Sequence, residues 1–365
     1  MIDPHAHLRD WNQASKETLR HGLSVAWRAG LDGIFEMPNT DPPLTTRDAI
    51  LRRIDDADTA ARGVGIGIVH GLYGGITAVP RQMEEMVRCW RELFPRVVGL
   101  KMFAGNSTGN MGVVDPREQA LVYRTLAALG YTGVLAVHAE KESLLRPADW
   151  NPTRPVSHAR ARPPAAEVAS VDEQMGFARK AGFAGTLHIC HVSTPWALDV
   201  LRGAHTRAPA DGTPAAEGTP LKLTCGLTPH HALLDANLME EKDGMLLKVN
   251  PPLRPLPLPS LMLRRLFDGD IDWIETDHAP HTRKDKIEGF ASGIPGFPYY
   301  PHFVALLKER GMSPARVNEL THDAICRVFA LSIPARGRAP DLRLSKEYEF
   351  DAFSFLGRAG RAQKR

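Results

Sequence analysis

Six side chains that can bind a metal ion or exchange a proton follow short apolar runs at widely separated points of the sequence. They are His5, His7, Lys101, His138, His191 and Asp277. Short apolar runs are typical of buried strands, and the carboxyl ends of the parallel strands of a barrel meet at one face. Imidazole and carboxylate groups are ligands that zinc accepts. Together these residues predict a binuclear metal site, and therefore a hydrolase.

The first two histidines are two residues apart, so in a strand His5 and His7 point to the same face. The alternative is a pair of buried histidines bonded to polar groups of the core. Lys101 ends an apolar run, where a charged ammonium group is costly. A desolvated lysine has a lowered pKa, and its neutral amine can react with carbon dioxide to give a carbamate that bridges two cations. A lysine paired with a nearby acid is the alternative.

His138 and His191 would complete the shell of the second metal ion. His188 competes with His191 for this role, but the odd spacing is expected to place the two on opposite faces of one strand. We choose His191 because the sequence continues there into a loop. Asp277 can take a proton from a metal-activated water and return it to a leaving nitrogen, whereas His278 is expected to point elsewhere and to be structural.

Eight apolar runs could provide the strands that position these side chains. They span residues 2–8, 33–37, 64–70, 97–103, 133–138, 186–192, 221–228 and 271–276. The segments between them have helical spacing, for example 84–94 and 117–129. Strands that alternate with helices predict a parallel sheet, and eight units predict an α/β fold of the (β/α)8 TIM barrel type. A doubly wound open sheet is the alternative, but no GxGxxG turn follows the first run.

The composition narrows the class of protein. The chain has 365 residues, of which 43% are hydrophobic, and its formal charge is only +3. Because acidic and basic residues are interspersed, neither nucleic acid nor a membrane surface is indicated as a partner. No secretory signal is evident at the start. The four cysteines are scattered without a CxxC pair, and Cys190 and Cys225 read as small buried thiols, so a reducing cytoplasm is expected.

Eight motifs between residue 2 and about residue 296 carry a family resemblance: DPHAHLR, EMPNTDPP, GLKMFAGNSTGN, VHAEKE, HICHVST, LTCGLTPHH, NPPLR and TDHAPH. Together they resemble the amidohydrolase superfamily and, within its cyclic amidase group, the dihydroorotases. The resemblance implies two zinc ions and a catalytic role for Asp277. The implied zinc ligands are His5, His7, Lys101 in carbamylated form, His138, His191 and Asp277.

The resemblance also implies a small-molecule substrate. The reaction would be the reversible ring closure of N-carbamoyl-L-aspartate to L-dihydroorotate in pyrimidine (UMP) biosynthesis. Arg9, Asn39 and His281 match positions that bind the free carboxylate of the substrate, and a guanidinium group suits this role because it offers paired donors. Asn250 matches the position that contacts the ring amide.

Other consequences of the resemblance concern a loop and the assembly. Ser107 or Thr108, in the loop 105–110 after the lysine, could contact the developing oxyanion. A homodimer is expected, and association with aspartate transcarbamoylase is left open.

The chain departs from the family pattern in four places. Asp10 and Trp11 stand where many dihydroorotases have a Pro-Gly turn, and Gly226 stands where the longer family type has an acidic residue. Residues 295–303 differ from the usual GxxGxET ending. The termini lack the usual pieces of the amidohydrolase β-sandwich, so we expect a barrel over residues 1–334, without that sandwich, and an extension of uncertain structure over residues 335–365.

Two other functions remain as alternatives. Another cyclic amidase (a dihydropyrimidinase, hydantoinase or allantoinase) would share the metal site but act on rings without the carboxylate, so Arg9 discriminates against it. A non-enzymatic scaffold for aspartate transcarbamoylase would tolerate missing metal ligands, whereas all six are present here.

Overall fold

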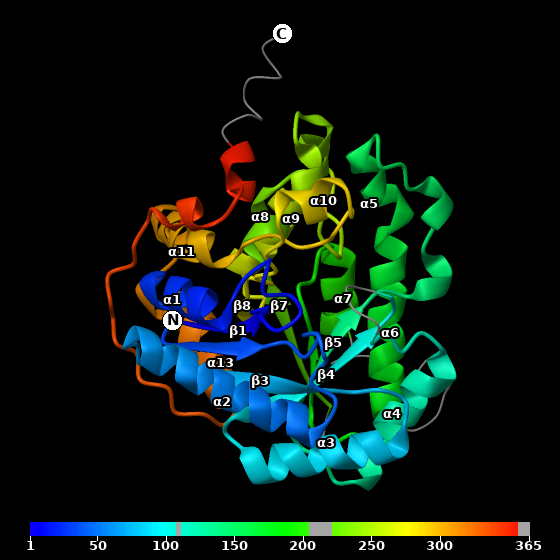
Figure 1. Cartoon of the computed structure of the whole chain (residues 1–365). Coiled ribbons are helices and arrows are strands. Elements are labelled where there is room, and N and C mark those ends of the chain that lie inside the picture. Colours follow the sequence, from blue (N-terminus) through cyan, green and yellow to red (C-terminus); the bar gives the residue numbers. More distant parts are fainter. Residues whose placement is uncertain (107–110, 204–220, 357–365) are drawn as a thin grey trace.

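The computed structural model describes residues 1–106, 111–203 and 221–356. Eight parallel strands form one sheet and follow one another in chain order: β1 (Ile2–Ala6), β2 (Gly33–Glu36), β3 (Val69–Gly75), β4 (Val97–Ala104), β5 (Val134–Ala139), β6 (Thr186–Ile189), β7 (Lys222–Leu227) and β8 (Trp273–Ile274). After β8 the chain pairs with β1, because the His7 N–H donates to the His278 carbonyl at 2.7 Å. The sheet thus closes on itself (Figure 1), and the predicted (β/α)8 barrel is confirmed.

Helices cover the outside of this barrel (Figure 1). The longer ones are α1 (Leu19–Arg28), α2 (Arg47–Val64), α3 (Pro80–Leu93), α4 (Pro116–Ala128), α6 (Pro164–Lys180), α7 (Pro195–Gly203), α9 (Leu258–Asp268) and α11 (Tyr300–Glu309). Shorter ones are α5 (His158–Ala161), α8 (Pro229–Leu233), α10 (Arg283–Ile287), α12 (Pro314–Asn318) and α13 (Ala324–Val328). Polar caps define several starts: Thr18, Thr46 and Asp115 accept backbone N–H groups at α1, α2 and α4.

The third strand lies further along the chain than the sequence predicts. The predicted run was 64–70, but Val64 still belongs to α2, which ends at Gly65 in the left-handed region with φ 67°. The strand instead uses the glycine-rich stretch VHGLYGG. A Cβ at Gly71 would lie 2.5 Å from Val98 of the neighbouring strand, so this glycine is required by packing. The prediction of this strand's position was therefore wrong, because close strand packing is not visible in the sequence.

Apolar side chains fill the end of the barrel where the strands begin. Phe329, just after α13, packs against Phe35 and Trp273, with ring centroids 4.9 and 5.9 Å away. Tyr73 and Ile325 complete this cluster and are fully buried. Because apolar side chains occupy this end, the inward-facing polar side chains collect at the carboxyl ends of the strands, where active sites of such barrels lie.

The segment 335–356 lies against the outside of the barrel. Tyr348 Oη donates to Glu17 Oε1 at 2.8 Å, and the Phe353 ring stacks on Tyr299 with centroids 3.7 Å apart. Every strand of the described ranges belongs to the barrel sheet. The extension therefore contributes helical turns and side-chain contacts to the described structure.

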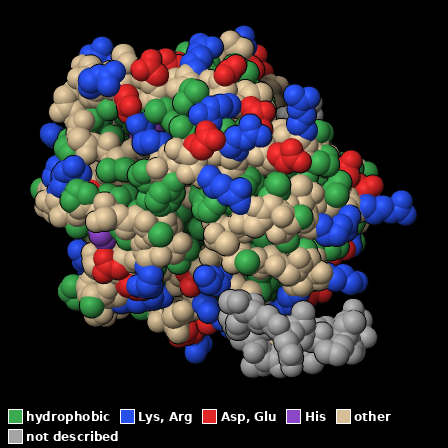
Figure 2. Space-filling view, turned by 90° about the horizontal axis from the view of Figure 1, so that it is seen from below, with side chains coloured by type: hydrophobic (Ala, Val, Ile, Leu, Met, Phe, Trp, Pro, Cys, Tyr) green, Lys and Arg blue, Asp and Glu red, His purple; other side chains and the backbone are tan. Residues whose placement is uncertain are grey.

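The surface shows no strong segregation of charge in the view of Figure 2, where basic and acidic side chains are interspersed among apolar ones. Among the helices of the described ranges, none combines the length and the apolar character needed to cross a bilayer.

Candidate active site

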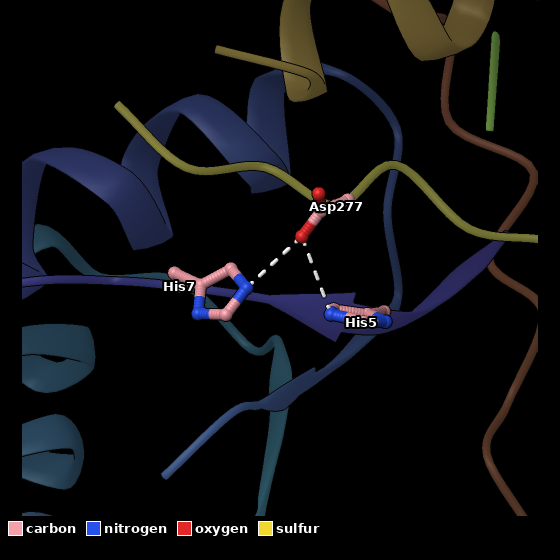
Figure 3. Close-up of side chains that lie close together, drawn as sticks. All are labelled: His5, His7 and Asp277. Atoms are coloured by element: carbon pink, nitrogen blue, oxygen red, sulfur yellow. Dashed lines mark hydrogen bonds and ion pairs between the residues drawn. The ribbon is translucent and has the colours of Figure 1, made fainter. Parts of the chain in front are cut away.

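The first group of predicted ligands meets at the junction of β1 and β8. Asp277 Oδ1 lies 2.9 Å from His7 Nε2 and 3.3 Å from His5 Nε2 (Figure 3). All three side chains are buried, and their candidate ligand atoms lie within 4.8 Å of one another. Two imidazole nitrogens and a carboxylate oxygen that converge in this way match the donor set of a divalent cation.

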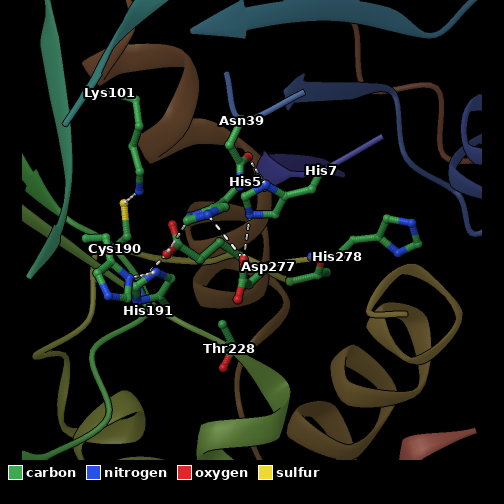
Figure 4. Close-up of polar contacts among 12 residues, drawn as sticks. His5, His7, Asn39, Lys101, Cys190, His191, Thr228, Asp277 and His278 are labelled. Carbon is green, nitrogen blue, oxygen red and sulfur yellow. Dashed lines mark hydrogen bonds and ion pairs between the residues drawn. The ribbon is translucent and has the colours of Figure 1, made fainter. Parts of the chain in front are cut away.

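The second group lies beside the first, at the ends of β4, β5 and β6. His138 Nδ1 is 3.2 Å from His191 Nε2, and the His191 ring lies 5.1 Å from the ring of His5. Lys101 reaches this group through Cys190, with 3.0 Å between Nζ and Sγ (Figure 4). The structure therefore brings all six predicted ligands to one buried region.

The protonation states of His7, His191 and Asp277 suit metal binding. Burial lowers the pKa of His7 to about 4 and that of His191 well below its usual range, so both imidazoles are neutral at pH 7. Burial alone would raise the pKa of Asp277, but the hydrogen bonds and charges of His5 and His7 hold it well below its usual range. Neutral imidazoles and an ionised carboxylate are the forms that bind a cation.

Three of the histidines have a polar partner on the ring nitrogen that faces away from the cluster. Asn39 Oδ1 lies 2.5 Å from His7 Nδ1, and Glu140 Oε2 lies 2.9 Å from His138 Nε2. Glu275 Oε1 lies 3.4 Å from His5 Nδ1. Such partners fix the tautomer and the ring orientation of metal-binding histidines. The residues are therefore arranged as ligands with supporting groups.

Sequence reasoning missed Glu140 and Glu275. Glu140 is two residues after His138, and Glu275 is two residues before Asp277, although both glutamates lie just beyond the ends of β5 and β8. That close spacing to predicted ligands was the signal that could have identified them. Cys190 is the small buried thiol that the sequence suggested, and it also contacts Lys101.

The structure corrects the expectation that His188 and His191 lie on opposite faces of one strand. β6 ends at Ile189, and His191 has φ 38°, so strand alternation does not extend to it. His188 also points into the barrel: its Nε2 lies 3.1 Å from Glu275, and its ring stacks on Trp273. Both histidines face the interior, but His191 lies with the other predicted ligands and His188 lies beside a carboxylate.

His278 points away from the cluster, as expected (Figure 4). Its Nε2 lies 3.1 Å from Glu17 Oε2, and its Nδ1 accepts the N–H of Gly296 at 3.1 Å. Its ring stacks on Phe297 at 3.7 Å. Because the same residue pairs through its carbonyl with His7, it holds β1 and the chain after β8 together.

A cavity opens beside the cluster. It is lined by His5, His7, Arg9, Asn39, Phe103, His138, His191, Asn250, Asp277, Ala279, Ser292 and Gly293. Arg9 Nη2 lies 3.1 Å from His281 Nε2. Arg9 Nη1 and His281 Nδ1 are buried and have no hydrogen-bond partner, which is costly unless a ligand supplies an acceptor. The structure thus places Arg9, Asn39, Asn250 and His281 in or next to one cavity, whereas Ser107 and Thr108 lie outside the described residues.

The turn that carries Arg9 has a left-handed backbone. Arg9, Asp10 and Trp11 have φ values of 49°, 64° and 50°, which cost roughly 1 kcal/mol or more for each residue with a side chain. The Asp10 carboxylate accepts the N–H groups of Trp11 and Leu19, each at 2.6 Å. The Arg53 guanidinium donates to the Arg9 carbonyl at 2.7 Å. These bonds stabilise the turn that stands in place of a Pro-Gly turn.

Arg53 is held in turn by a buried carboxylate. Glu36, at the end of β2, accepts hydrogen bonds from Arg53 and lies 2.9 Å from His70 Nε2. Both Glu36 and Arg53 are fully buried. Burial alone would raise the pKa of Glu36, but the charges and hydrogen bonds of Arg53 and His70 lower it to about 2.

Replacing Glu36 by glutamine is expected to lower the free energy of unfolding at neutral pH by about 3 kcal/mol, because Arg53 would be buried without its counter-ion. The folded-state pKa of about 2 lies below the ordinary value of 4.5. The stabilisation by Glu36 is therefore present above pH 4.5 and is lost as the pH falls toward 2. Urea unfolding over this pH range should show that the difference in unfolding free energy between wild type and Glu36→Gln narrows as the pH falls.

A matched control is Glu92→Gln, which removes the carboxylate of an exposed pair with Arg47. Its effect should be at most about 1 kcal/mol at any pH. If the difference in unfolding free energy between wild type and Glu36→Gln stayed constant with pH, ionisation of Glu36 would not be what stabilises the fold.

Comparison with known proteins places the chain in a family. No protein-family model matches the sequence. A dihydroorotase from Halobacterium salinarum is 32% identical over 354 residues, covering 94% of this chain and 75% of that protein. A dihydroorotase from Lactiplantibacillus plantarum is 31% identical over 373 residues, covering 98% of this chain and 79% of that protein.

Solved structures show the same fold. An L-hydantoinase (dihydropyrimidinase) from Arthrobacter aurescens has a TM-score of 0.76 at 24% identity, over 90% of this chain and 70% of that one. A dihydroorotase from Campylobacter jejuni has a TM-score of 0.66 at 16% identity, over 91% of this chain and 83% of that one. With the barrel, the buried ligand set and the sequence relatives in agreement, the chain belongs to the dihydroorotase family of cyclic amide hydrolases.

Proposed function

We propose that this protein catalyses the reversible ring closure of N-carbamoyl-L-aspartate to L-dihydroorotate, in pyrimidine biosynthesis. One observation carries the choice of substrate: Arg9 lines the same cavity as His5, His7 and Asp277, and its buried Nη1 has no hydrogen-bond partner. A ring with a free carboxylate would supply the missing acceptor, and paired bonds from a guanidinium to a carboxylate are strong and directional.

We propose that two zinc ions bind at His5, His7, Lys101, His138, His191 and Asp277. The convergence of the ligand atoms of His5, His7 and Asp277 and the buried, unpartnered Nδ1 of His191 support this proposal. When bound, such ions lower the pKa of a water molecule and polarise a carbonyl group.

The surroundings of Lys101 support its proposed carbamylation. The side chain is fully buried, and its Nζ contacts Cys190 Sγ and lies 5.1 Å from the centre of the Phe103 ring. Among the residues that the structure describes, no carboxylate lies within ion-pair distance of Nζ. The alternative of a lysine paired with a carboxylate therefore has no partner in the described ranges, and the acidic side chain in contact with Nζ is the Cys190 thiol.

The other residues would orient the substrate and move the proton. Arg9, Asn39 and His281 would hold the carboxylate of the substrate. Asn250 Oδ1 lies 2.9 Å from His158 Nε2, which directs the Asn250 amide nitrogen, a donor, toward an acceptor such as a ring carbonyl. In the hydrolytic direction Asp277 would take the proton of the attacking water and deliver it to the departing ring nitrogen.

The reaction is tested by turnover of L-dihydroorotate, dihydrouracil, allantoin and a substituted hydantoin, with protein prepared in zinc and bicarbonate. Selective turnover of L-dihydroorotate would support the proposal. Turnover of an uncharged ring instead would make the chain another cyclic amidase with the same metal chemistry.

Replacing Arg9 by methionine should lower kcat/KM for L-dihydroorotate by about 10- to 100-fold, the value of one or two charge-assisted hydrogen bonds. Any residual turnover of dihydrouracil should change much less, because that ring has no carboxylate. Arg62→Met, a surface change on α2, is the control and should leave both values unchanged. Equal losses for the two substrates would exclude Arg9 as the carboxylate-binding residue.

We further propose that residues 1–334 form the catalytic barrel and that residues 335–365 form an extension. The contacts of Tyr348 with Glu17 and of Phe353 with Tyr299 support an extension that braces the barrel. By the family resemblance, the enzyme is proposed to act in the cytoplasm as a homodimer, with aspartate transcarbamoylase as a candidate partner.

A further inference from the structure

Glu275 is a fully buried carboxylate surrounded by donors from three strands. It accepts the backbone N–H of His191, and its Oε2 accepts Trp273 Nε1–H at 3.1 Å. The same oxygen lies 3.1 Å from His188 Nε2, and Oε1 lies 3.4 Å from His5 Nδ1. A buried carboxylate with so many partners is fixed in position. It thus connects the start of the His191 loop to one of the predicted zinc ligands.

Space for this carboxylate exists because residue 226 has no side chain. A Cβ at Gly226 would lie 2.3 Å from Glu275 Cδ, 2.4 Å from Oε2 and 2.7 Å from Oε1. Gly226 does not have a positive φ, so glycine is needed here for space and not for backbone conformation. The Glu275 carboxylate cannot move aside without breaking its bonds to the surrounding donors. Gly226 and Glu275 are therefore coupled across the β7–β8 pair.

Glu275 brings its carboxyl carbon to within 2.3 Å of where a Cβ at residue 226 would lie. We infer that Glu275 is a positioning residue for His5, and that it can take this position only because residue 226 is glycine.

The two ring nitrogens of His5 face different carboxylates. Nε2 faces Asp277 at 3.3 Å, while Nδ1 faces Glu275 at 3.4 Å. A carboxylate at Nδ1 places the ring proton there and leaves Nε2 unprotonated toward the metal side. This inference rests on the proposed role of His5 as a zinc ligand. Loss of such a supporting carboxylate typically lowers metal affinity about 10- to 100-fold.

The test asks whether a carboxylate placed at residue 226 on β7 can replace the carboxylate of Glu275. Glu275→Ala should lower zinc affinity, measured by competition with a chelator, by about 10- to 100-fold. The double variants Gly226→Asp/Glu275→Ala and Gly226→Glu/Glu275→Ala return a carboxylate from β7 at two lengths. At least one of them should recover most of the zinc affinity and the visible spectrum of the cobalt-substituted protein. Gly226→Ala with Glu275 retained should instead lower the zinc affinity and alter the cobalt spectrum, because the new Cβ displaces the Glu275 carboxylate.

Glu275→Gln keeps the side-chain volume, so it separates positioning from folding. It should remain folded under the conditions of the zinc measurement, as circular dichroism can check, and still show weakened zinc binding and an altered cobalt spectrum. The control Glu288→Ala removes an exposed carboxylate after α10 and should change neither the zinc affinity nor the cobalt spectrum. Wild-type zinc affinity in Glu275→Gln, or no recovery in either double variant, would overturn the inference. Failure of the wild-type protein to bind zinc would instead contradict the proposed metal site. Failure of the inference about Glu275 and failure of the proposed metal site are therefore distinguishable.

Discussion

Lys101→Ala is expected to lose bound zinc and hydrolase activity together. Removing the amine removes the group that would form the carbamate, and the two cations would lose their shared anionic ligand. Without that ligand, the imidazoles supply no negative charge to offset the two cations in a buried region. We expect turnover below about one thousandth of wild type, since metal activation of water contributes several kcal/mol. Metal content by atomic absorption, measured beside the rate, checks both losses.

Lys141→Ala is the matched control for this change. Lys141 follows β5 and pairs with Glu173 on α6, so its loss should affect neither zinc content nor rate. A second measurement addresses the carbamate itself: a short carboxylic acid such as propionate, added to Lys101→Ala, should restore part of the zinc and part of the rate. Full zinc occupancy and full rate in Lys101→Ala would show that no carbamate forms there.

Asp277→Asn is expected to lower kcat by about 100- to 10,000-fold, the usual contribution of a positioned acid–base group. An amide cannot carry the proton from the attacking water to the ring nitrogen. Its oxygen can still face His5 and His7, which now lie 3.3 and 2.9 Å from Asp277 Oδ1. Some zinc should therefore remain bound, so this variant separates proton transfer from metal binding.

The control for the aspartate is Asp268→Asn, a surface change at the end of α9 that should leave kcat unchanged. For Asp277→Asn, the rate and the zinc content should be measured on the same preparation. If Asp277→Asn kept more than about a tenth of the wild-type rate with zinc bound, another residue would have to move the proton, and the assignment of Asp277 would be wrong.

Much of the fold could be predicted from the sequence. Seven of the eight apolar runs overlap the observed strands closely, because a strand buried on both faces requires apolar residues regardless of its neighbours. The exception is β3, which was predicted at residues 64–70 but uses the glycine-rich stretch VHGLYGG. Those glycines are in a strand because adjacent strands approach closely, as the 2.5 Å distance from a Cβ at Gly71 to Val98 shows. That is a property of the packed barrel.

Residue types and strand ends also determined which side chains could bind metal. His5, His7, Lys101, His138, His191 and Asp277 were predicted to converge, and they lie in one region because parallel strands of a closed barrel end at one face. Their roles stay predictions until metal content and rate are measured.

The tertiary structure alone decided which residues support them. Glu275 lies against His5 because Gly226 on the neighbouring strand leaves room for its carboxylate. His191 faces the interior together with His188 because it lies beyond the end of β6, where strand alternation no longer applies. The sequence by itself determined the barrel and the chemical groups at its strand ends, since strand burial and residue type are local properties. Which group touches which depends on distances across strands and on side-chain volumes, and those exist only once the barrel has closed.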